Sequence, residues 1–162
     1  MNPIVVMGVS GCGKTTLGQA LAERLSATFL DADDFHSAAN VEKMRAGAPL
    51  DDDDRQPWLA TLNRELRERA HRGERVVLAC SALKRRYRKV IGAQVARLDW
   101  IFLDGSFELI AERMRARPNH YMPESLLRSQ FAALEAPDNA THIAIDLSVA
   151  EQVEAALSAL AI

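Results

Sequence analysis

The chain has 162 residues, with 20 Lys and Arg, 22 Asp and Glu, and a formal net charge of −2. This length suits one domain with a full hydrophobic core, so we expect a single domain over residues 1–162. A charge balance this close to neutral lacks the broad positive field that nucleic-acid and membrane-surface binders need, and we expect neither kind of partner.

The cysteine content and the hydropathy indicate the kind of cellular environment in which the protein works. Cys12 and Cys80 form neither a disulfide framework nor a metal-ligand spacing. No apolar stretch approaches the roughly 20 residues that cross a bilayer, and no leader-like segment opens the chain. We therefore expect a soluble protein of the reducing cytoplasm that binds a small molecule.

Apolar runs alternate with helical periodicities along the whole chain. We expect strands at about 3–8, 28–31, 75–80, 99–104 and 142–146. Between them, apolar residues recur every three or four positions, as on helices that pack one face against a sheet: Leu17, Leu21 and Leu25; Leu59, Leu62 and Leu66; Tyr87, Val90 and Ile91; Phe107, Ile110 and Met114; Leu127, Phe131 and Leu134; Val149, Val153, Leu157 and Leu160. Gly73 is expected to stop the helix that precedes it. The alternation predicts an α/β fold with a mainly parallel sheet.

Residues 8–15 read GVSGCGKT, which fits the phosphate-binding pattern G-x-x-x-x-G-K-[ST] directly after the apolar run 4–7. Glycines let backbone N–H groups approach phosphate oxygens, while Lys14 supplies charge for the outer phosphates and Thr15 a hydroxyl for Mg²⁺. A ligand-free glycine turn is the alternative, but it does not explain why Lys and Thr stand together. We expect a nucleoside triphosphate to bind this loop and the start of the helix after it: Gly8, Val9, Ser10, Gly11, Cys12, Gly13, Lys14, Thr15 and Thr16.

Polar residues follow the second and third predicted strands, at the sheet edge where open parallel sheets bind ligands. Asp31 is expected to orient Mg²⁺, and Asp33 to accept a proton from an attacking hydroxyl. A turn or helix-cap role is the alternative for both. Ser81 and Lys84 follow the third strand, and Lys84 is expected to face an anionic substrate while the other basic residues of 85–89 face solvent.

Two more side chains are candidates on chemical grounds. His36 can hydrogen-bond a polyol or a carboxylate, although a solvated loop histidine is the alternative. The acidic run 51–54 is explained by a helix start, since acidic residues favour an N-terminus. Arg55 is less well explained in that way, because its planar donors suit bidentate capture of a carboxylate.

Residues 113–123 end a helix in arginines and continue into a loop bracketed by prolines. This pattern suits a mobile lid over approximately residues 115–125. Arg113 and Arg117 are expected to bring charge onto a transferring phosphoryl group, and Arg115 to face solvent. The alternative is that these cations complement the dipole of their own helix.

Four stretches resemble the gluconate kinases of the short, shikimate-kinase-like type: GVSGCGKTT, FLDADDFHSAANVEKMRAGAPLDDDDRQPWL, CSALKRRYR and HYMPESLLRSQFAALEAPD. They span nearly the whole chain in the family's order. The resemblance implies a three-layer, nucleoside-monophosphate-kinase-like P-loop kinase fold with a five-stranded parallel sheet and a lid. It also implies ATP- and Mg²⁺-dependent phosphorylation of D-gluconate to 6-phospho-D-gluconate by a homodimer. Ala32 and Ser37 stand where the family commonly has glycine and proline, which affects loop stiffness near His36.

The family pattern also implies which residues surround the sugar acid: Asp33, His36, Lys43, Arg55, Ser81, Lys84 and Gln130. Gluconate has one carboxylate and several hydroxyls, and such a polar set suits it better than a nucleobase. Two alternatives stay open, namely the same fold with shikimate, a nucleoside or a nucleoside monophosphate as acceptor, and a nucleotide-dependent switch without an acceptor. Adenine contacts are expected near residues 136–139.

Overall fold

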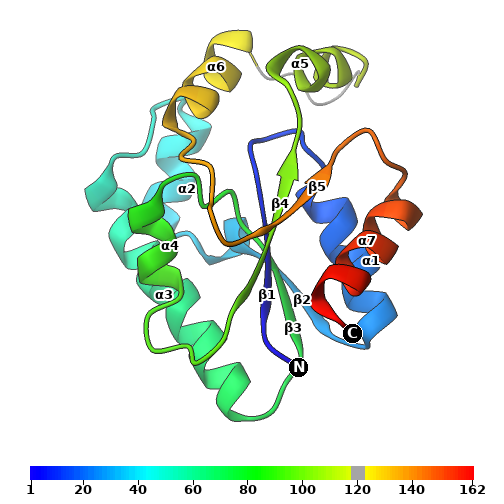
Figure 1. The fold of residues 1–162 in the computed structure, drawn as a ribbon. Coiled ribbons are helices and arrows are strands. Elements are labelled where there is room, and N and C mark those ends of the chain that lie inside the picture. Colours follow the sequence, from blue (N-terminus) through cyan, green and yellow to red (C-terminus); the bar gives the residue numbers. More distant parts are fainter. Residues whose placement is uncertain (118–122) are drawn as a thin grey trace.

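The computed structural model describes residues 1–117 and 123–162, and these residues form one five-stranded parallel sheet with helices around it (Figure 1). The strands are β1 (Ile4–Met7), β2 (Thr28–Asp31), β3 (Val76–Ala79), β4 (Asp99–Asp104) and β5 (Thr141–Ala144). Their order is β2-β3-β1-β4-β5, and every neighbouring pair is parallel. The strand order therefore reverses beside β1, the point at which open α/β sheets bind their ligands.

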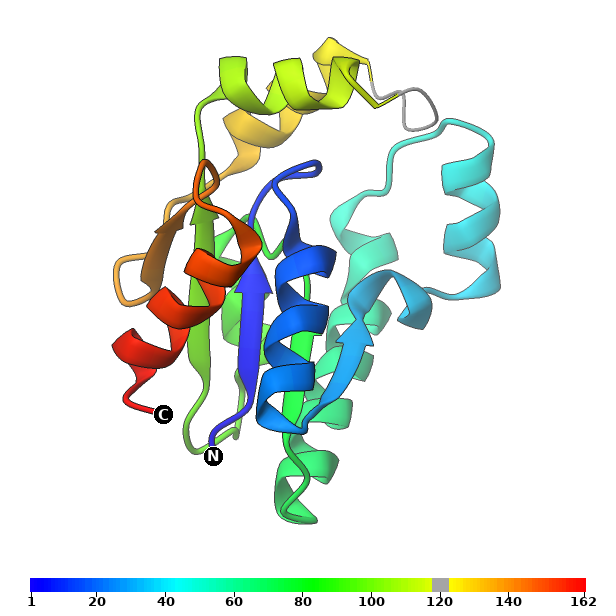
Figure 2. The ribbon, with the colours of Figure 1, turned by 90° about the vertical axis from the view of Figure 1, so that its right-hand side faces the viewer.

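Helices cover both faces of the sheet and the carboxyl ends of its strands. Their bounds are α1 (Lys14–Leu25), η1 (a 3-10 helix, Ala32–Phe35), α2 (Ala38–Arg45), α3 (Asp52–His71), α4 (Arg85–Ile91), α5 (Phe107–Arg115), α6 (Glu124–Ala133) and α7 (Val149–Leu160). Side chains of α1 and α7 share one core with the sheet, and those of α3 and α4 share the other. α5 and α6 lie beyond the carboxyl ends of the strands, at the top of Figure 2.

The central strand shows why both faces are covered. Ile4 and Val6 of β1 point into the core with α1 and α7, whereas Val5 and Met7 point into the core with α3 and α4, and all four are fully buried. Side chains alternate between the two faces of a strand, so a continuous apolar run marks a strand that is buried on both. The segment that enters the phosphate-binding loop is therefore among the most firmly packed in the molecule.

All five predicted strands are present, and β1 and β3 are one residue shorter at each end than the expected 3–8 and 75–80. β5 covers Thr141–Ala144, slightly earlier than the expected 142–146, while β2 and β4 have the expected bounds. Gly73 has φ of 73° just after α3, as expected of a helix stop. α2 was not predicted from the sequence, because Asn40 is its one buried side chain and it has no apolar stripe. Among the residues described, no helix is both long and apolar enough to cross a bilayer.

Candidate functional site

Two cavities adjoin at the carboxyl edge of the sheet. The first, of about 480 Å³, is lined mainly by the loop of residues 8–15 together with Asp31 and Arg117, and we call it the loop cavity. The second, of about 720 Å³, extends between η1, the start of α3, the start of α4 and α6, and we call it the side cavity. Ser10, Asp33 and Ser81 line both. We refer to these three as the junction residues.

The loop of residues 8–15, the phosphate loop, has the backbone that its glycines predict. Gly8, Gly11 and Gly13 have φ of 150°, 80° and 98°, which side chains disfavour. A Cβ added to Gly11 would lie 2.8 Å from Met114 Sδ, so α5 packs directly on the loop. α1 begins at Lys14 with no side-chain cap and no acidic residue in its first turn. Its first N–H groups and its positive dipole end are thus available to an anion.

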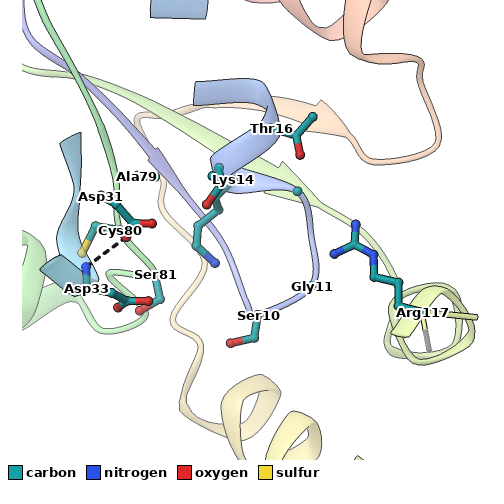
Figure 3. A pocket seen from close by; sticks show the side chains of 12 residues that line it. Ser10, Gly11, Lys14, Thr16, Asp31, Asp33, Ala79, Cys80, Ser81 and Arg117 are labelled. Carbon is teal, nitrogen blue, oxygen red and sulfur yellow. Dashed lines mark hydrogen bonds between the residues drawn. The ribbon is translucent and has the colours of Figure 1, made fainter. Parts of the chain in front are cut away.

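The ammonium of Lys14 lies back over the phosphate loop. Its Nζ donates hydrogen bonds to the backbone oxygens of Gly8 and Val9, both at 3.0 Å. Figure 3 shows this side chain reaching between Ser10 and the residues that follow β2. A polyphosphate entering the loop cavity would therefore meet a positive charge that the loop already holds in place.

Asp31 and Asp33 stand where β2 passes into η1. Asp31 Oδ1 accepts a hydrogen bond from the backbone N–H of Asp33 at 3.0 Å, so the helix-cap role weighed from the sequence is real. Asp31 also lines the loop cavity together with Thr15, so capping does not remove it from the site. Burial, and next the charge of Asp31, raise the pKa of the Asp33 carboxyl. A junction carboxylate with a raised pKa is suited to take up a proton.

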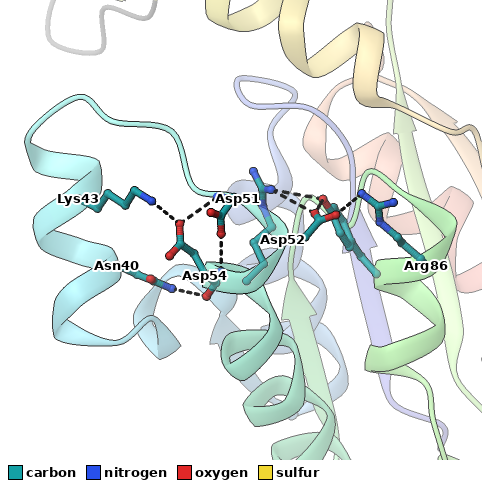
Figure 4. A network of polar contacts seen from close by, with 8 residues as sticks. Asn40, Lys43, Asp51, Asp52, Asp54 and Arg86 are labelled. Carbon is teal, nitrogen blue, oxygen red and sulfur yellow. Dashed lines mark hydrogen bonds and ion pairs between the residues drawn. The ribbon is translucent and has the colours of Figure 1, made fainter.

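The side cavity has a cationic wall built from α3 and α4. Arg55 Nη1 donates to Tyr87 Oη at 3.3 Å and lies 3.6 Å from Asp52 Oδ1. Tyr87 Oη donates to the same carboxylate oxygen at 2.7 Å, and Arg86 pairs with Asp52 from the solvent side (Figure 4). Lys84 lines the cavity beside this network. The wall therefore offers two cations to an anionic occupant.

His36 also lines the side cavity, where its ring stacks on that of Trp58 with the centroids 4.2 Å apart. Asn40 Nδ2 donates to the backbone oxygen of Asp54 at 2.8 Å and lies 3.4 Å from His36 Nδ1. Because an amide nitrogen only donates, His36 Nδ1 accepts and the ring proton sits on Nε2. Burial lowers the pKa of His36, which favours the neutral ring. This histidine is thus prepared to donate one hydrogen bond.

Comparison with known proteins identifies the family of the chain. The family described as an AAA domain matches residues 4–137. A gluconokinase of Arabidopsis thaliana is 45% identical over 148 residues, covering 83% of this chain and 78% of the plant protein. The thermosensitive gluconokinase of Escherichia coli K12 is 42% identical over 163 residues, covering 96% of this chain and 87% of the relative. The crystal structure of a gluconokinase from Sinorhizobium meliloti 1021 matches with a TM-score of 0.88 and 44% identity, covering 99% of this chain and 91% of that one. The chain belongs to the gluconokinase family.

Membership of the gluconokinase family confirms the resemblance seen in the four sequence stretches. It also confirms the three-layer P-loop kinase fold, whose five parallel strands the structure shows in the order given above. A member of a kinase family is a phosphotransferase, which removes the alternative of a nucleotide switch without an acceptor.

Most of the predicted site residues come together in this gluconokinase-family chain. The loop cavity and the junction contain Ser10, Gly11, Gly13, Lys14, Thr15, Thr16, Asp31, Asp33, Ser81 and Arg117. The side cavity adds His36, Arg55, Lys84 and Gln130. Gly8, Val9 and Cys12 belong to the phosphate loop without lining the cavity, and the side chains of Val9 and Cys12 are buried in the core.

Lys43 lies outside both cavity linings. Its Nζ is 2.6 Å from Asp54 Oδ2, a contact that raises the pKa of the lysine. Asp54 in turn forms a capping box with Asp51, in which Asp54 N donates to Asp51 Oδ1 at 2.7 Å and Asp51 N donates to Asp54 Oδ2 at 3.0 Å (Figure 4). The acidic run is therefore a helix start, as the sequence predicts, and Lys43 ties α2 to it.

The three arginines at the start of the expected lid and just before it have different surroundings. Arg117 lines the loop cavity and extends toward the phosphate loop (Figure 3). Arg115 is exposed, as predicted, and pairs with Glu124 Oε1 at 2.5 Å. Arg113 is half-buried on α5 and lines neither cavity. Residues 118–122 of the predicted lid lie outside the described residues, and residues 123–125 form the N-cap and the start of α6.

The sequence did not reveal the roles of three residues in and around the site, of which Tyr87 lines the side cavity and Arg88 and Asn40 lie behind the cavity linings. Arg88 was expected to face solvent, and this was wrong: it is half-buried and donates to the backbone oxygens of Ala82 and Glu135, both at 2.7 Å. Its partners are backbone atoms, which no residue pattern reveals. Tyr87 and Asn40 were also missed, and an aromatic residue inside a basic cluster was the one available signal for Tyr87.

Proposed function

We propose that this chain transfers the γ-phosphoryl group of ATP to D-gluconate and forms 6-phospho-D-gluconate. The observation that carries the proposal is the junction, because Ser10, Asp33 and Ser81 line both cavities. A polyphosphate on the loop and a small acceptor in the side cavity would meet there. The gluconokinases among the relatives support the choice of acceptor.

ATP would occupy the loop cavity with its phosphates on the loop N–H groups and the ammonium of Lys14. The hydroxyl of Thr15 and the carboxylate of Asp31 are the oxygen donors that would hold Mg²⁺. Among the described residues no group of three or more His, Cys, Asp or Glu side chains could hold a metal. Such a sparse protein set fits Mg²⁺, which usually keeps water and substrate phosphates as its other ligands. When bound, the ion would supply positive charge to the phosphates.

Gluconate would occupy the side cavity. Arg55 and Lys84 would bind its carboxylate, and His36 would donate to a hydroxyl. Ser81 and Gln130 add polar groups at the end nearest the phosphate loop. A nucleobase has neither a carboxylate for the two cations nor a chain of hydroxyls for the other donors, so it would leave several of these groups unpaired, which is the physical basis for rejecting it.

Lys43 enters the proposal indirectly. Its ion pair with Asp54 joins α2 to the first turn of α3, the helix that carries Arg55 and Trp58 into the side cavity. We propose that Lys43 supports the acceptor site in this way, since its Nζ is already engaged.

The proposed reaction is an in-line displacement. The terminal hydroxyl oxygen of gluconate forms a bond to the γ-phosphorus, the bond from that phosphorus to the β–γ bridging oxygen breaks, and ADP leaves. Asp33 would orient the attacking hydroxyl and take up its proton late in the step, because a largely dissociative transition state depends on positioning and leaves little for a strong base to do. Lys14 and Arg117 would neutralise charge on the transferring group, and Arg113 would join them if the lid of residues 115–125 closes and excludes water.

An acceptor panel tests this function. ADP release from ATP is followed with gluconate, shikimate, a nucleoside and a nucleoside monophosphate, each with Mg²⁺. We expect release only with gluconate, well above the rate without an acceptor. Release with shikimate or a nucleotide but not with gluconate would refute the proposed acceptor.

The assembly and location of the protein are further parts of the proposal. By resemblance to the family we propose a homodimer of single-domain subunits, acting in the cytoplasm. Light scattering on the purified protein tests the first point, with twice the mass of one chain as the expected result.

A further inference from the structure

The side chain of Gln130 on α6 forms two hydrogen bonds with Ser10 of the phosphate loop. The backbone N–H of Ser10 donates to Gln130 Oε1 at 2.7 Å, and Gln130 Nε2 donates to Ser10 Oγ at 3.0 Å. Because a backbone N–H can only donate, the first bond determines which end of the amide faces it. Both bonds are partly buried, and we call them together the Ser10–Gln130 contact.

The same residue lines the cavity on its other side. Gln130 belongs to the wall of the side cavity, and Ser10 is a junction residue. The amide uses its oxygen and one of its two Nε2 hydrogens on Ser10, which leaves one N–H for an occupant of the side cavity. One side chain thus touches the loop that would carry the phosphates and the space that would carry the acceptor.

The phosphate loop has a particular need for such a contact. Its three glycines have φ values open to few other residues, and a glycine-rich segment loses much conformational freedom when a ligand orders it. A contact that orders the loop beforehand removes that cost from binding. Two helices therefore contact the loop at adjacent residues. Met114 of α5 packs on Gly11, and Gln130 of α6 binds Ser10.

We propose that Gln130 is a positioning residue, which preforms the phosphate loop through Ser10 and couples the side cavity to it. In this reading the residue does more than surround the sugar acid. An acceptor that binds the remaining N–H would steady the amide on Ser10, so it would raise the affinity for nucleotide, and nucleotide would raise the affinity for the acceptor by the same factor. The coupling to gluconate rests on the proposed function, whereas the effect on nucleotide binding does not.

The first part of the proposal is that Gln130 preforms the phosphate loop. Calorimetric titration with a non-hydrolysable ATP analogue and Mg²⁺, without gluconate, tests it. Gln130→Met removes both bonds at similar side-chain length, and Ser10→Ala removes only the bond to the hydroxyl. Each lost bond should weaken nucleotide binding roughly 2- to 12-fold, so Gln130→Met should lose more than Ser10→Ala. Ser158→Ala, at an exposed position of α7 outside both cavities and outside the expected lid, should bind as the wild type does.

Repeating the titration with saturating gluconate tests the second part of the proposal, the coupling between the side cavity and the phosphate loop. The wild type and Ser158→Ala should bind the analogue more tightly than without gluconate. Gln130→Met should lose that gain while its Tm stays close to that of the wild type. Unchanged nucleotide affinity in Gln130→Met with weakened gluconate binding would overturn the proposal, and so would a loss that only follows a lowered Tm. Should the wild type not phosphorylate gluconate, the proposed function fails, while weaker acceptor-free nucleotide binding in Gln130→Met still supports the positioning role.

Discussion

Replacing Lys14 with methionine should remove most of the turnover while leaving the fold intact. The ammonium makes two hydrogen bonds to backbone oxygens, at 3.0 Å each. A hydrogen bond from a charged group contributes about 1.5–3 kcal/mol net, so the two bonds set an upper bound of about 3–6 kcal/mol on the loss, against a total stability of roughly 5–15 kcal/mol. Loss of one preorganised donor to a developing charge costs about 100- to 1,000-fold in kcat. The catalytic loss should therefore far exceed any loss of folded protein.

The assay is coupled ADP release at saturating gluconate and ATP, with a thermal melt of the same sample. Lys89→Met is the matched control, because Lys89 is an exposed lysine of α4 outside both cavities. It should keep the turnover of the wild type. Turnover of Lys14→Met within about threefold of the wild type, in folded protein, would refute the phosphate-loop mechanism.

Three further predictions concern the junction, the loop and the side cavity. The folded protein favours the protonated form of Asp33, since its pKa is raised, so stability should fall as pH rises from the usual carboxyl range through that pKa. Asp33→Asn should flatten this dependence in a melt series and be no less stable at neutral pH, yet lose most of its activity; lower stability there would contradict the reasoning. Gly11→Ala should lower the Tm more than Gly73→Ala, because both have positive φ but a Cβ meets an atom at 2.8 Å only at Gly11. Equal losses would show that the packing does not matter. Tyr87→Phe should raise the KM for gluconate several-fold by freeing Arg55 from its hydroxyl, whereas Lys43→Ala should change that KM less; the reverse order would place Lys43 at the substrate.

The sequence predicted a helix or strand well wherever a buried face of that element requires apolar residues at regular intervals. β1 is apolar throughout because both faces are covered, and α1 follows it with leucines four residues apart. α2 carries no such signal, since its one buried side chain is Asn40, which is held by polar contacts. The strand order could not be predicted from the spacing of apolar residues, because it depends on which strands pair in the folded chain rather than on any single segment.

The candidate site was predictable where the residue type itself carries the chemistry. The phosphate loop, Asp33 and Arg55 are of this kind, and they line the cavities. The Ser10–Gln130 contact joins residues 120 positions apart, and one of its bonds is made by a backbone N–H. Arg88 likewise acts on two backbone oxygens. Such contacts depend on the folded path of the chain, so side-chain patterns do not reveal them.

The position of the transferred phosphate tests the central claim most directly. ³¹P NMR of a reaction containing the protein, Mg²⁺, ATP and gluconate identifies the product without any coupling enzyme. If the two cavities meet at Ser10, Asp33 and Ser81 as proposed, a single phosphomonoester should form on the terminal carbon, with its phosphorus coupled to the two protons there. Inorganic phosphate alone, or an ester at another carbon, would contradict the account.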